Sequence, residues 1–256
     1  SSDLDPDFDT PISEIGGRDS IWGGVANDTI YGGPAGDVIW GNAGRDFGYG
    51  DAGPDVLFGD DGEYTKPEPG RDESVTQATS GGDEDHLEGN GGDDLIFGGE
   101  ATDLIFGGFN LQSPYPDGAL DPDGADVILG DFGFGARRAD SVIEAHTTST
   151  DGEGDEIYGN EGDDVVLAGS GVDTVKGGDG DDVLFGDHGH MTRSKSGFLL
   201  SYVSTDITAG ASDDIRGDGD DDTPIWRSLQ PPAAAPPLPL LARQRACSRL
   251  ASAGPE

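Results

Sequence analysis

The run GGVANDTIY-GGPAGDVIW-GNAGRDFGY-GDAGPDVLF, residues 23–58, sets the architecture of this chain. It consists of four consecutive units of nine residues, each of which begins with glycine and carries aspartate at its sixth position. The same register returns at residues 89–106 and 159–185. Partial copies flank these blocks around Asp19, Asp85, Asp126, Asp155, Asp213 and Asp222. A short fixed period of this kind is typical of a solenoid, in which each unit stacks on its neighbours.

Each unit has two halves with different chemistry. The first six residues are rich in glycine and aspartate and must turn, because glycine at the first, second and fourth positions tolerates positive φ. Those glycines also leave backbone carbonyls open to a bound ion, and the sixth-position aspartate adds a carboxylate. The last three residues, such as Thr29-Ile30-Tyr31, favour extended structure. Turns and short strands should therefore alternate along the chain.

The composition narrows the classes of partner. Only 33% of the 256 residues are hydrophobic, and 52 acidic residues face 14 basic ones, which gives a net charge of -38. This charge disfavours nucleic acid and anionic membranes as partners and favours divalent cations. The single cysteine, Cys247, cannot form an intramolecular disulfide. No stretch is long and apolar enough to span a bilayer.

The nonamer resembles the RTX (repeats-in-toxin, haemolysin-type) calcium-binding nonapeptide, Gly-Gly-x-Gly-x-Asp-x-U-x, where U is a large apolar residue. The resemblance implies an all-β fold, a right-handed parallel β-roll (a β-solenoid) in which two nonamers complete one coil. Multiple Ca²⁺ ions would lie between stacked turns and take backbone carbonyls and sixth-position carboxylates from two turns each. The implied metal ligands are Asp19, Asp28, Asp37, Asp46, Asp55, Asp85, Asp94, Asp103, Asp126, Asp155, Asp164, Asp173, Asp182, Asp213 and Asp222.

Turns two repeats apart would share an ion in this arrangement. The shared sites would pair Asp19 with Asp37, Asp28 with Asp46, Asp37 with Asp55, Asp155 with Asp173 and Asp164 with Asp182. Counting such pairs within uninterrupted blocks predicts about six to ten ions.

The eighth position of the repeat predicts the interior. It holds Ile21, Ile30, Ile39, Leu57, Ile96, Ile105, Ile128, Ile157, Val166, Val175 and Leu184. We expect this thin layer to be the whole core, so it cannot offset backbone ordering at about 1 to 2 kcal/mol per residue, and metal must supply much of the folding free energy. Gly48 and Pro224 occupy inward positions and should weaken their coils. Ala26, Ala35 and Ala101 replace glycine at the fourth position and put the local turn geometry in question.

Three inserts interrupt the repeats, each after a Gly-Asp-x-Gly that begins at Gly59, Gly130 or Gly186. Regular copies resume 30, 29 and 31 residues later, which indicates that a longer unit is duplicated as well. Apolar or β-prone stretches flank turn residues within the inserts and predict hairpins.

The predicted organisation has nine segments. They are an acidic linker (1–15), a first block (16–62), an insert (63–81), a second block (82–133) with a Pro-rich loop (109–122), an insert (134–152), a third block (153–189), an insert (190–211), a last partial block (212–225) and a Pro/Ala/Arg-rich tail (226–256) outside the roll. The Asp121-Pro-Asp123-Gly stretch lacks EF-hand spacing and is interpreted as linker.

We expect no catalysis from this chain, because its serines lack a nucleophile-elbow motif and its four histidines lack zinc-protease spacing. His188 and His190, beside Asp187, could bind a transition metal, but a variable turn position needs nothing from histidine, which disfavours that interpretation. His86 and His146 are interpreted as solvated. Ninth-position aromatics such as Trp22 and Tyr31 invite a carbohydrate-stacking interpretation, but adjacent copies face alternate sides of a roll, which favours ordinary packing.

The resemblance implies a secreted, calcium-dependent structural or folding module, exported from a bacterial cell by type I secretion and folded by the calcium outside. Two alternatives stay open: the ancillary C-terminal roll of a larger secreted protease, lipase or polysaccharide-modifying enzyme, and an adhesin or surface-layer component. The expected partners are calcium ions, without nucleic acid or a membrane span. Any contact with a cell surface or a carbohydrate is assigned to the inserts.

Overall fold

The computed structural model describes residues 12–13, 17–68, 71–76, 82–110, 122–138, 141–148, 152–194, 199–205 and 211–225. The predicted tail (226–256) lies outside these residues, as do most of the acidic linker and of the Pro-rich loop. The described residues form strands and no helix, so they include no helix capable of crossing a membrane.

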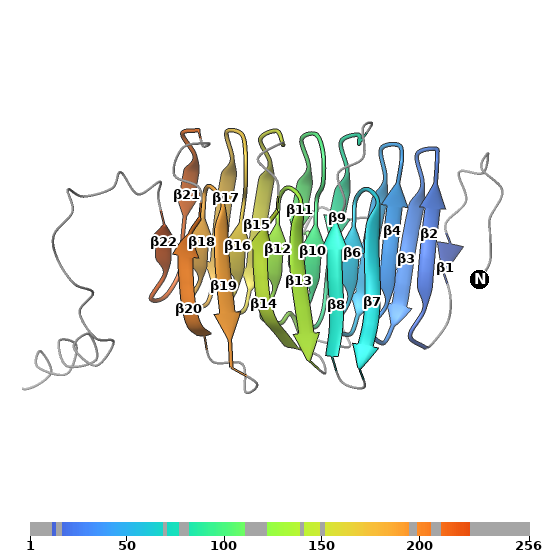
Figure 1. The fold of residues 1–256 in the computed structure, drawn as a ribbon, viewed down its shortest axis with the longest axis horizontal. Coiled ribbons are helices and arrows are strands. Elements are labelled where there is room, and N and C mark those ends of the chain that lie inside the picture. The colour runs from blue at the N-terminus through green and yellow to red at the C-terminus, as the bar shows by residue number, and fades with distance from the viewer. Residues whose placement is uncertain are drawn as a thin grey trace, which may run out of the picture.

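The repeats form two parallel sheets of eight strands each, and consecutive repeats alternate between the sheets (Figure 1). Sheet I contains β1 (Ile12–Ser13), β3 (Thr29–Pro34), β5 (Phe47–Ala52), β9 (His86–Glu88), β11 (Leu104–Phe106), β15 (Glu156–Glu161), β17 (Thr174–Asp179) and β21 (Asp214–Arg216). Sheet II contains β2 (Ser20–Gly24), β4 (Val38–Asn42), β6 (Val56–Phe58), β10 (Leu95–Phe97), β12 (Val127–Leu129), β16 (Val165–Leu167), β18 (Val183–Phe185) and β22 (Thr223–Ile225). The predicted parallel β-roll, with two repeats per coil, is thus confirmed. One boundary is corrected, because β1 falls within the expected linker yet pairs with β3.

The eighth-position residues fill the space between the two sheets. They pair in register along each sheet, as Ile21 does with Ile39 and Ile96 with Ile128. All eleven residues that the sequence predicted to point inward belong to this one buried cluster, which also contains Leu87, Ala168 and Ile215.

Two inward positions lack a large apolar residue. A Cβ added at Gly48 would lie 3.1 Å from Cδ2 of Leu87 and 3.8 Å from Cγ2 of Ile39, so larger neighbours already crowd the space. Pro224 is exposed in β22, at the end of sheet II. The expected weakness of these coils stays a prediction.

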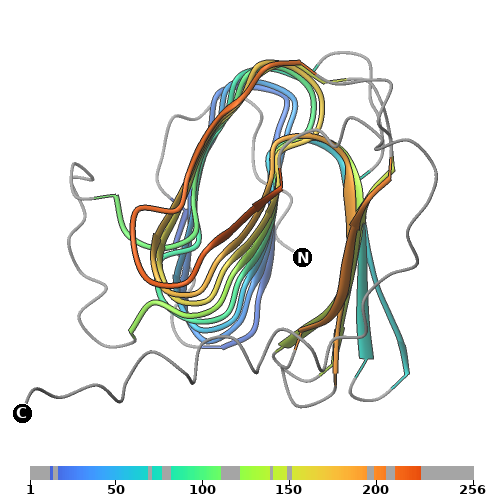
Figure 2. The ribbon, with the colours of Figure 1, turned by 90° about the vertical axis from the view of Figure 1, so that its left-hand side faces the viewer.

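The three inserts form hairpins, as the sequence predicted, and the hairpins join edge to edge, which the sequence did not predict. The strands are β7 (Gly62–Glu68) and β8 (Arg71–Thr76), β13 (Gly133–Arg138) and β14 (Ser141–Thr147), and β19 (Gly189–Arg193) and β20 (Leu199–Ser204). Because β8 pairs with β13 and β14 pairs with β19, the hairpins make one antiparallel sheet of six strands, here called the hairpin sheet. Figure 2 shows it covering the outer face of sheet II.

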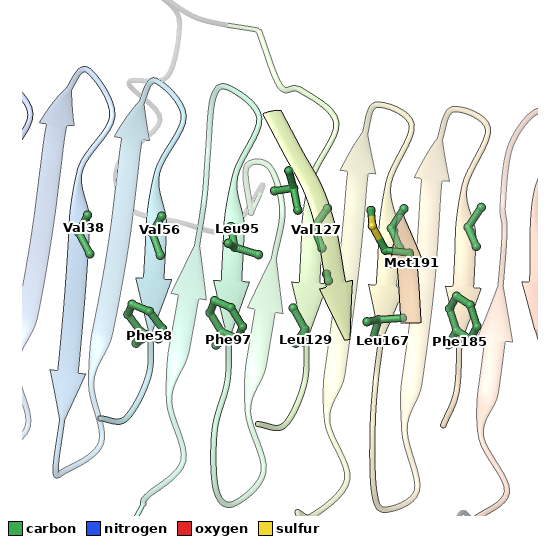
Figure 3. Close-up of a cluster of buried hydrophobic side chains, with 14 of the residues drawn as sticks. Val38, Val56, Phe58, Leu95, Phe97, Val127, Leu129, Leu167, Phe185 and Met191 are labelled. Atoms are coloured by element: carbon green, nitrogen blue, oxygen red, sulfur yellow. The ribbon is translucent and has the colours of Figure 1, made fainter. Parts of the chain in front are cut away.

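A second apolar layer lies between sheet II and the hairpin sheet. In Figure 3, Val38, Val56 and Leu95 line up along sheet II beside a parallel line of phenylalanine and leucine side chains. The hairpin sheet contributes Val142, Ala145 and Met191 to this layer. The expectation of a single thin core was therefore wrong: the seventh and ninth positions of sheet II are also buried in the strands from β4 to β18.

Aromatic rings at the ninth position stack along both faces of the roll. Trp22 stacks on Trp40 with centroids 4.7 Å apart, and Trp40 lies 5.7 Å from Phe58, all on sheet II. Tyr31 stacks on Tyr49 at 4.9 Å on sheet I. The periodic aromatics thus split into separate stripes, and because the ring faces contact each other, the geometry favours packing over carbohydrate stacking.

Candidate metal centres

The sixth-position aspartates form two rows along the roll. Each of these residues directly precedes a strand, so parallel stacking of the strands also stacks the aspartates. Row I consists of the aspartates that directly precede strands of sheet I, namely Asp28, Asp46, Asp85, Asp103, Asp155, Asp173 and Asp213. Row II consists of the aspartates that directly precede strands of sheet II, namely Asp19, Asp37, Asp55, Asp94, Asp126, Asp164, Asp182 and Asp222. Every predicted ligand thus lies in one of the two rows.

Neighbours within a row are joined by a hydrogen bond. The main-chain N–H of Asp37 donates to Oδ1 of Asp55 at 2.6 Å, and the same contact recurs at 2.6 to 3.2 Å along both rows. Seven such bonds in row II and six in row I make thirteen neighbouring pairs among the described residues, including all five pairs expected from the sequence. The rows continue across the inserts, since Asp103 joins Asp155 at a separation of 52 residues.

In eleven of these aspartates the second carboxylate oxygen, Oδ2, is buried and forms no hydrogen bond within the described part of the chain. The eleven such Oδ2 atoms belong to Asp37, Asp46, Asp55, Asp85, Asp94, Asp103, Asp126, Asp155, Asp164, Asp173 and Asp182. A buried carboxylate oxygen without a partner is costly. Eleven of them in regular rows indicate that these oxygens have a cationic partner.

The first position of the turn borders the space next to each such oxygen, and it is glycine in every case except Ala168, which precedes Asp173. A Cβ added at Gly32 would lie 2.8 Å from Oδ2 of Asp37 and 2.6 Å from the carbonyl oxygen of Gly50 in the next coil. Gly23 meets the equivalent pair of atoms, Oδ2 of Asp28 and the Gly41 carbonyl, at 2.9 and 2.7 Å. At these two glycines a Cβ would overlap the oxygens that border the space.

In the described turns, positive φ occurs at the second and fourth positions of the repeat and not at the first. Examples are Gly33 (φ 95°) at the second position and Gly44 (φ 123°) at the fourth. The first position thus does not use the positive φ that glycine tolerates, and glycine there leaves space beside the carboxylate. Ala35 and Ala101 adopt φ of 86° and 77°, so these two turns keep the left-handed conformation with alanine, whereas Ala26 does not adopt positive φ.

Carboxylate and carbonyl oxygens are the ligands that Ca²⁺ prefers. The residues present fit this ion on two grounds: the orphaned Oδ2 atoms of the rows and the space that the first-position glycines leave beside them. Bound there, Ca²⁺ would supply the positive charge that the buried carboxylates lack.

Burial opposes ionisation of the rows. It raises the pKa of Asp182 to about 6, of Asp37 to about 7 and of Asp85 to about 8, from an ordinary value of 3.8. Burial also raises the pKa of Asp94 and Asp126 well above that value, and at Asp126 the charge of its row neighbour adds to the effect. A compact chain at neutral pH therefore needs either protons or metal on these groups.

Acid should partly replace calcium. The pKa values of these carboxyls in the folded chain lie above the unfolded value of 3.8, so protonation stabilises the metal-free roll. This stabilisation is complete below about pH 4 and is lost as the pH rises through 6 to 8. We expect the chain in EDTA to gain β-structure in far-UV circular dichroism as the pH falls from 8 to 4. A β-signal that declines on acidification would contradict the buried-carboxylate geometry.

Each hairpin insert lies inside a turn, between its first and sixth positions. An added Cβ at Gly59 meets Oδ2 of Asp85, and one at Gly130 meets Oδ2 of Asp155, as the first and sixth positions do in uninterrupted turns. The two ends of each interrupted turn therefore come together after an excursion of more than twenty residues.

Sequence reasoning missed three buried aspartates at the start of the inserts: Asp60, Asp131 and Asp187. Oδ2 of Asp60 accepts a hydrogen bond of 2.7 Å from the Glu100 N–H, and burial raises the pKa of Asp60 to about 7. Burial is the largest cause of the raised pKa of nearby row I carboxyls, and the charges of Asp60, Asp131 and Asp187 add to it. The recurring Gly-Asp-x-Gly could have identified them, because it repeats an aspartate at the second position of each interrupted turn.

Two further side chains connect neighbouring elements to the rows. Oδ2 of Asp123 accepts a hydrogen bond of 2.9 Å from the Glu161 N–H, so its interpretation as linker was wrong. The buried Arg137 of the hairpin sheet donates to the carbonyls of Asp55 at 2.8 Å and Asp93 at 3.0 Å. Its guanidinium charge opposes the burial-driven rise in the pKa of Asp55.

His188 and His190 lie in different parts of the structure. His188 is buried, and its Nε2 lies 3.3 Å from Oγ of Ser170 in the turn that leads to Asp173. His190 instead lies on the hairpin sheet beside His146.

Comparison with known protein families matches the RTX calcium-binding nonapeptide repeat to this chain. The matched segments are residues 16–48, 40–63, 79–110, 151–175 and 158–190. No curated protein and no solved structure matches the chain. The matched residues carry turns of both rows on either side of the first two inserts and before the third.

Proposed function

Because this chain is built of RTX calcium-binding nonapeptide repeats, we propose that it is a secreted module folded by the Ca²⁺ that it binds along rows I and II. The ligands would be the sixth-position carboxylates and the first-position carbonyls of neighbouring coils. The observation that carries the proposal is the series of eleven buried Oδ2 atoms without hydrogen-bond partners.

Electrostatic repulsion explains why the module would remain unfolded without metal. The chain carries a net charge of -38, and neighbouring aspartates in each row are close enough to form hydrogen bonds with one another. In a calcium-poor cytosol these charges would keep the chain open and suited to export. Extracellular calcium-binding modules typically have dissociation constants of about 10⁻⁴ to 10⁻³ M, so calcium outside the cell would fold it.

The proposed number of ions exceeds the estimate from sequence. That estimate, about six to ten, counted pairs only within uninterrupted blocks. The thirteen neighbouring pairs include those that cross the inserts, and each is a candidate position for one ion. The proposal gives the chain a structural role and assigns it no catalysis.

Circular dichroism during calcium titration tests the proposal. We expect the full chain in EDTA at pH 7.5 to show a coil spectrum and to convert cooperatively to β-structure with Ca²⁺. Mg²⁺ should not substitute at equal concentration, since it demands a smaller octahedral site. A spectrum that does not respond to calcium would overturn the proposal.

A further inference from the structure

The outer face of the hairpin sheet carries three metal-ligating side chains that the calcium rows do not use: Glu144, His146 and His190. Glu144 and His146 are two residues apart on β14, so they share one face of the strand. His190, on β19, lies directly opposite His146 in the β14–β19 pairing. The alternate residues, Ala145 and Met191, are fully buried in the second apolar layer and fix the direction in which the three side chains point.

The donor atoms of the three side chains converge. One ligand atom from each lies within 4.8 Å of the others, and Nε2 of His190 is 3.3 Å from Oε1 of Glu144. The two imidazole rings have centroids 5.4 Å apart and meet edge to face. Phe134 lies against His146 at 5.1 Å and limits the movement of that ring.

The cluster is enclosed and still reachable from solvent. Nε2 of His190 has almost no exposed surface and no hydrogen-bond partner of acceptable geometry within the described residues. The side chains of His190 and Glu144 as a whole are 37% and 38% exposed, which leaves a path for an ion.

We propose that Glu144, His146 and His190 form a site for a divalent transition-metal ion of the Zn²⁺ class. Two imidazoles and one carboxylate are a common donor set for such ions and leave further coordination positions for water. Ligands bonded to Zn²⁺ at about 2.0 to 2.2 Å are roughly 3.3 to 3.5 Å apart, so the carboxylate–imidazole pair already has a suitable separation. The all-oxygen rows have the opposite preference and favour Ca²⁺.

The proposed ion would join two inserts. Glu144 and His146 belong to the second hairpin and His190 to the third, so metal would link β14 to β19 in addition to their backbone hydrogen bonds. This stabilisation would act on the hairpin sheet and is independent of whether calcium folds the roll.

Calorimetric titration of the calcium-saturated full chain with Zn²⁺ tests this site. The chain should carry Cys247→Ser, so that its one thiol does not compete for the metal. His146→Gln and His190→Gln remove one ligand each with little change in volume, and far-UV circular dichroism in Ca²⁺ checks that both variants fold. His86→Gln is the matched control, because His86 also contacts a carboxylate, Glu88 at 2.6 Å, but belongs to no cluster of three ligands among the described residues.

We expect one Zn²⁺ per chain and a loss of affinity of about tenfold or more in both variants, with the control unchanged. Shifts of the imidazole ¹⁵N resonances of His146 and His190 on adding Zn²⁺ should accompany binding. The absence of one-to-one binding would overturn the proposal, as would unchanged affinity in the His190 variant or an equal loss in the control. If His146→Gln does not fold in calcium, His190→Gln and Glu144→Gln decide the question.

Discussion

Replacing Asp94 with asparagine should raise the calcium concentration at the folding midpoint by about tenfold or more. Asp94 is fully buried at the middle of row II, and its Oδ2 has no hydrogen-bond partner among the described residues. Its Oδ1 accepts the Asp55 N–H, and its own N–H donates to Oδ1 of Asp126, so the residue connects two candidate ion positions. Asparagine would remove the charge from both positions at once.

The midpoint is measured by circular dichroism against free calcium, with Asp220→Asn as the control. Asp220 is exposed in the last turn of the roll, and its replacement causes the same change in net charge. We expect the control to shift the midpoint by less than about twofold, since exposed charges contribute little. Equal shifts in both variants would mean that net charge, and not the row geometry, sets the calcium requirement.

Gly98→Ala should cause a comparable loss through a steric mechanism. An added Cβ at Gly98 would lie 2.5 Å from Oδ2 of Asp103 and would also overlap the carbonyl oxygen of Gly130 in the next coil. Both oxygens border the space assigned to a row I ion, and the carbonyl cannot retreat without moving the backbone. Positive φ is not required at Gly98, so alanine introduces no backbone strain that could confuse the result.

The comparison for this variant is Gly17→Ala. A Cβ added at Gly17 meets no atom within 4 Å, so the control adds a methyl group in open space. We expect the Gly98 variant to need about tenfold more calcium for folding and the Gly17 variant to match the parent chain. A Gly98 variant with an unchanged midpoint would show that the ion lies elsewhere in the turn.

Much of the roll could be predicted from the nonamer alone. A nine-residue period with alternating turn and triad fixes which residues stack, so the inward positions and the two aspartate rows follow from counting. The hairpin sheet could not be predicted in this way, because the pairing of β8 with β13 and of β14 with β19 joins segments far apart in sequence. The sequence also gives no register for these pairs.

The second apolar layer nevertheless left a pattern in the repeats. The triads of the six inner strands of sheet II, such as Val56-Leu57-Phe58 and Val183-Leu184-Phe185, are apolar throughout, whereas those of sheet I include His86-Leu87-Glu88 and Thr174-Val175-Lys176. Reading alternate repeats separately would have indicated that one face of the roll is covered. The cluster of His146 and His190 had no such pattern, since only the register of β14 with β19 brings the two rings together.

The position of the inserts inside turns bears on the entropy of assembling the roll. Stacked aspartates are 18 residues apart within a block, as Asp37 and Asp55 are, and 39 apart across the first insert, as Asp46 and Asp85 are. Each doubling of a flexible loop adds only about 0.6 kcal/mol to its closure cost, so an insert hardly changes the free energy of adding the next coil. Calcium-driven growth of the stack can therefore proceed by closing short loops one after another, and it can continue past each hairpin almost as easily as along an uninterrupted block.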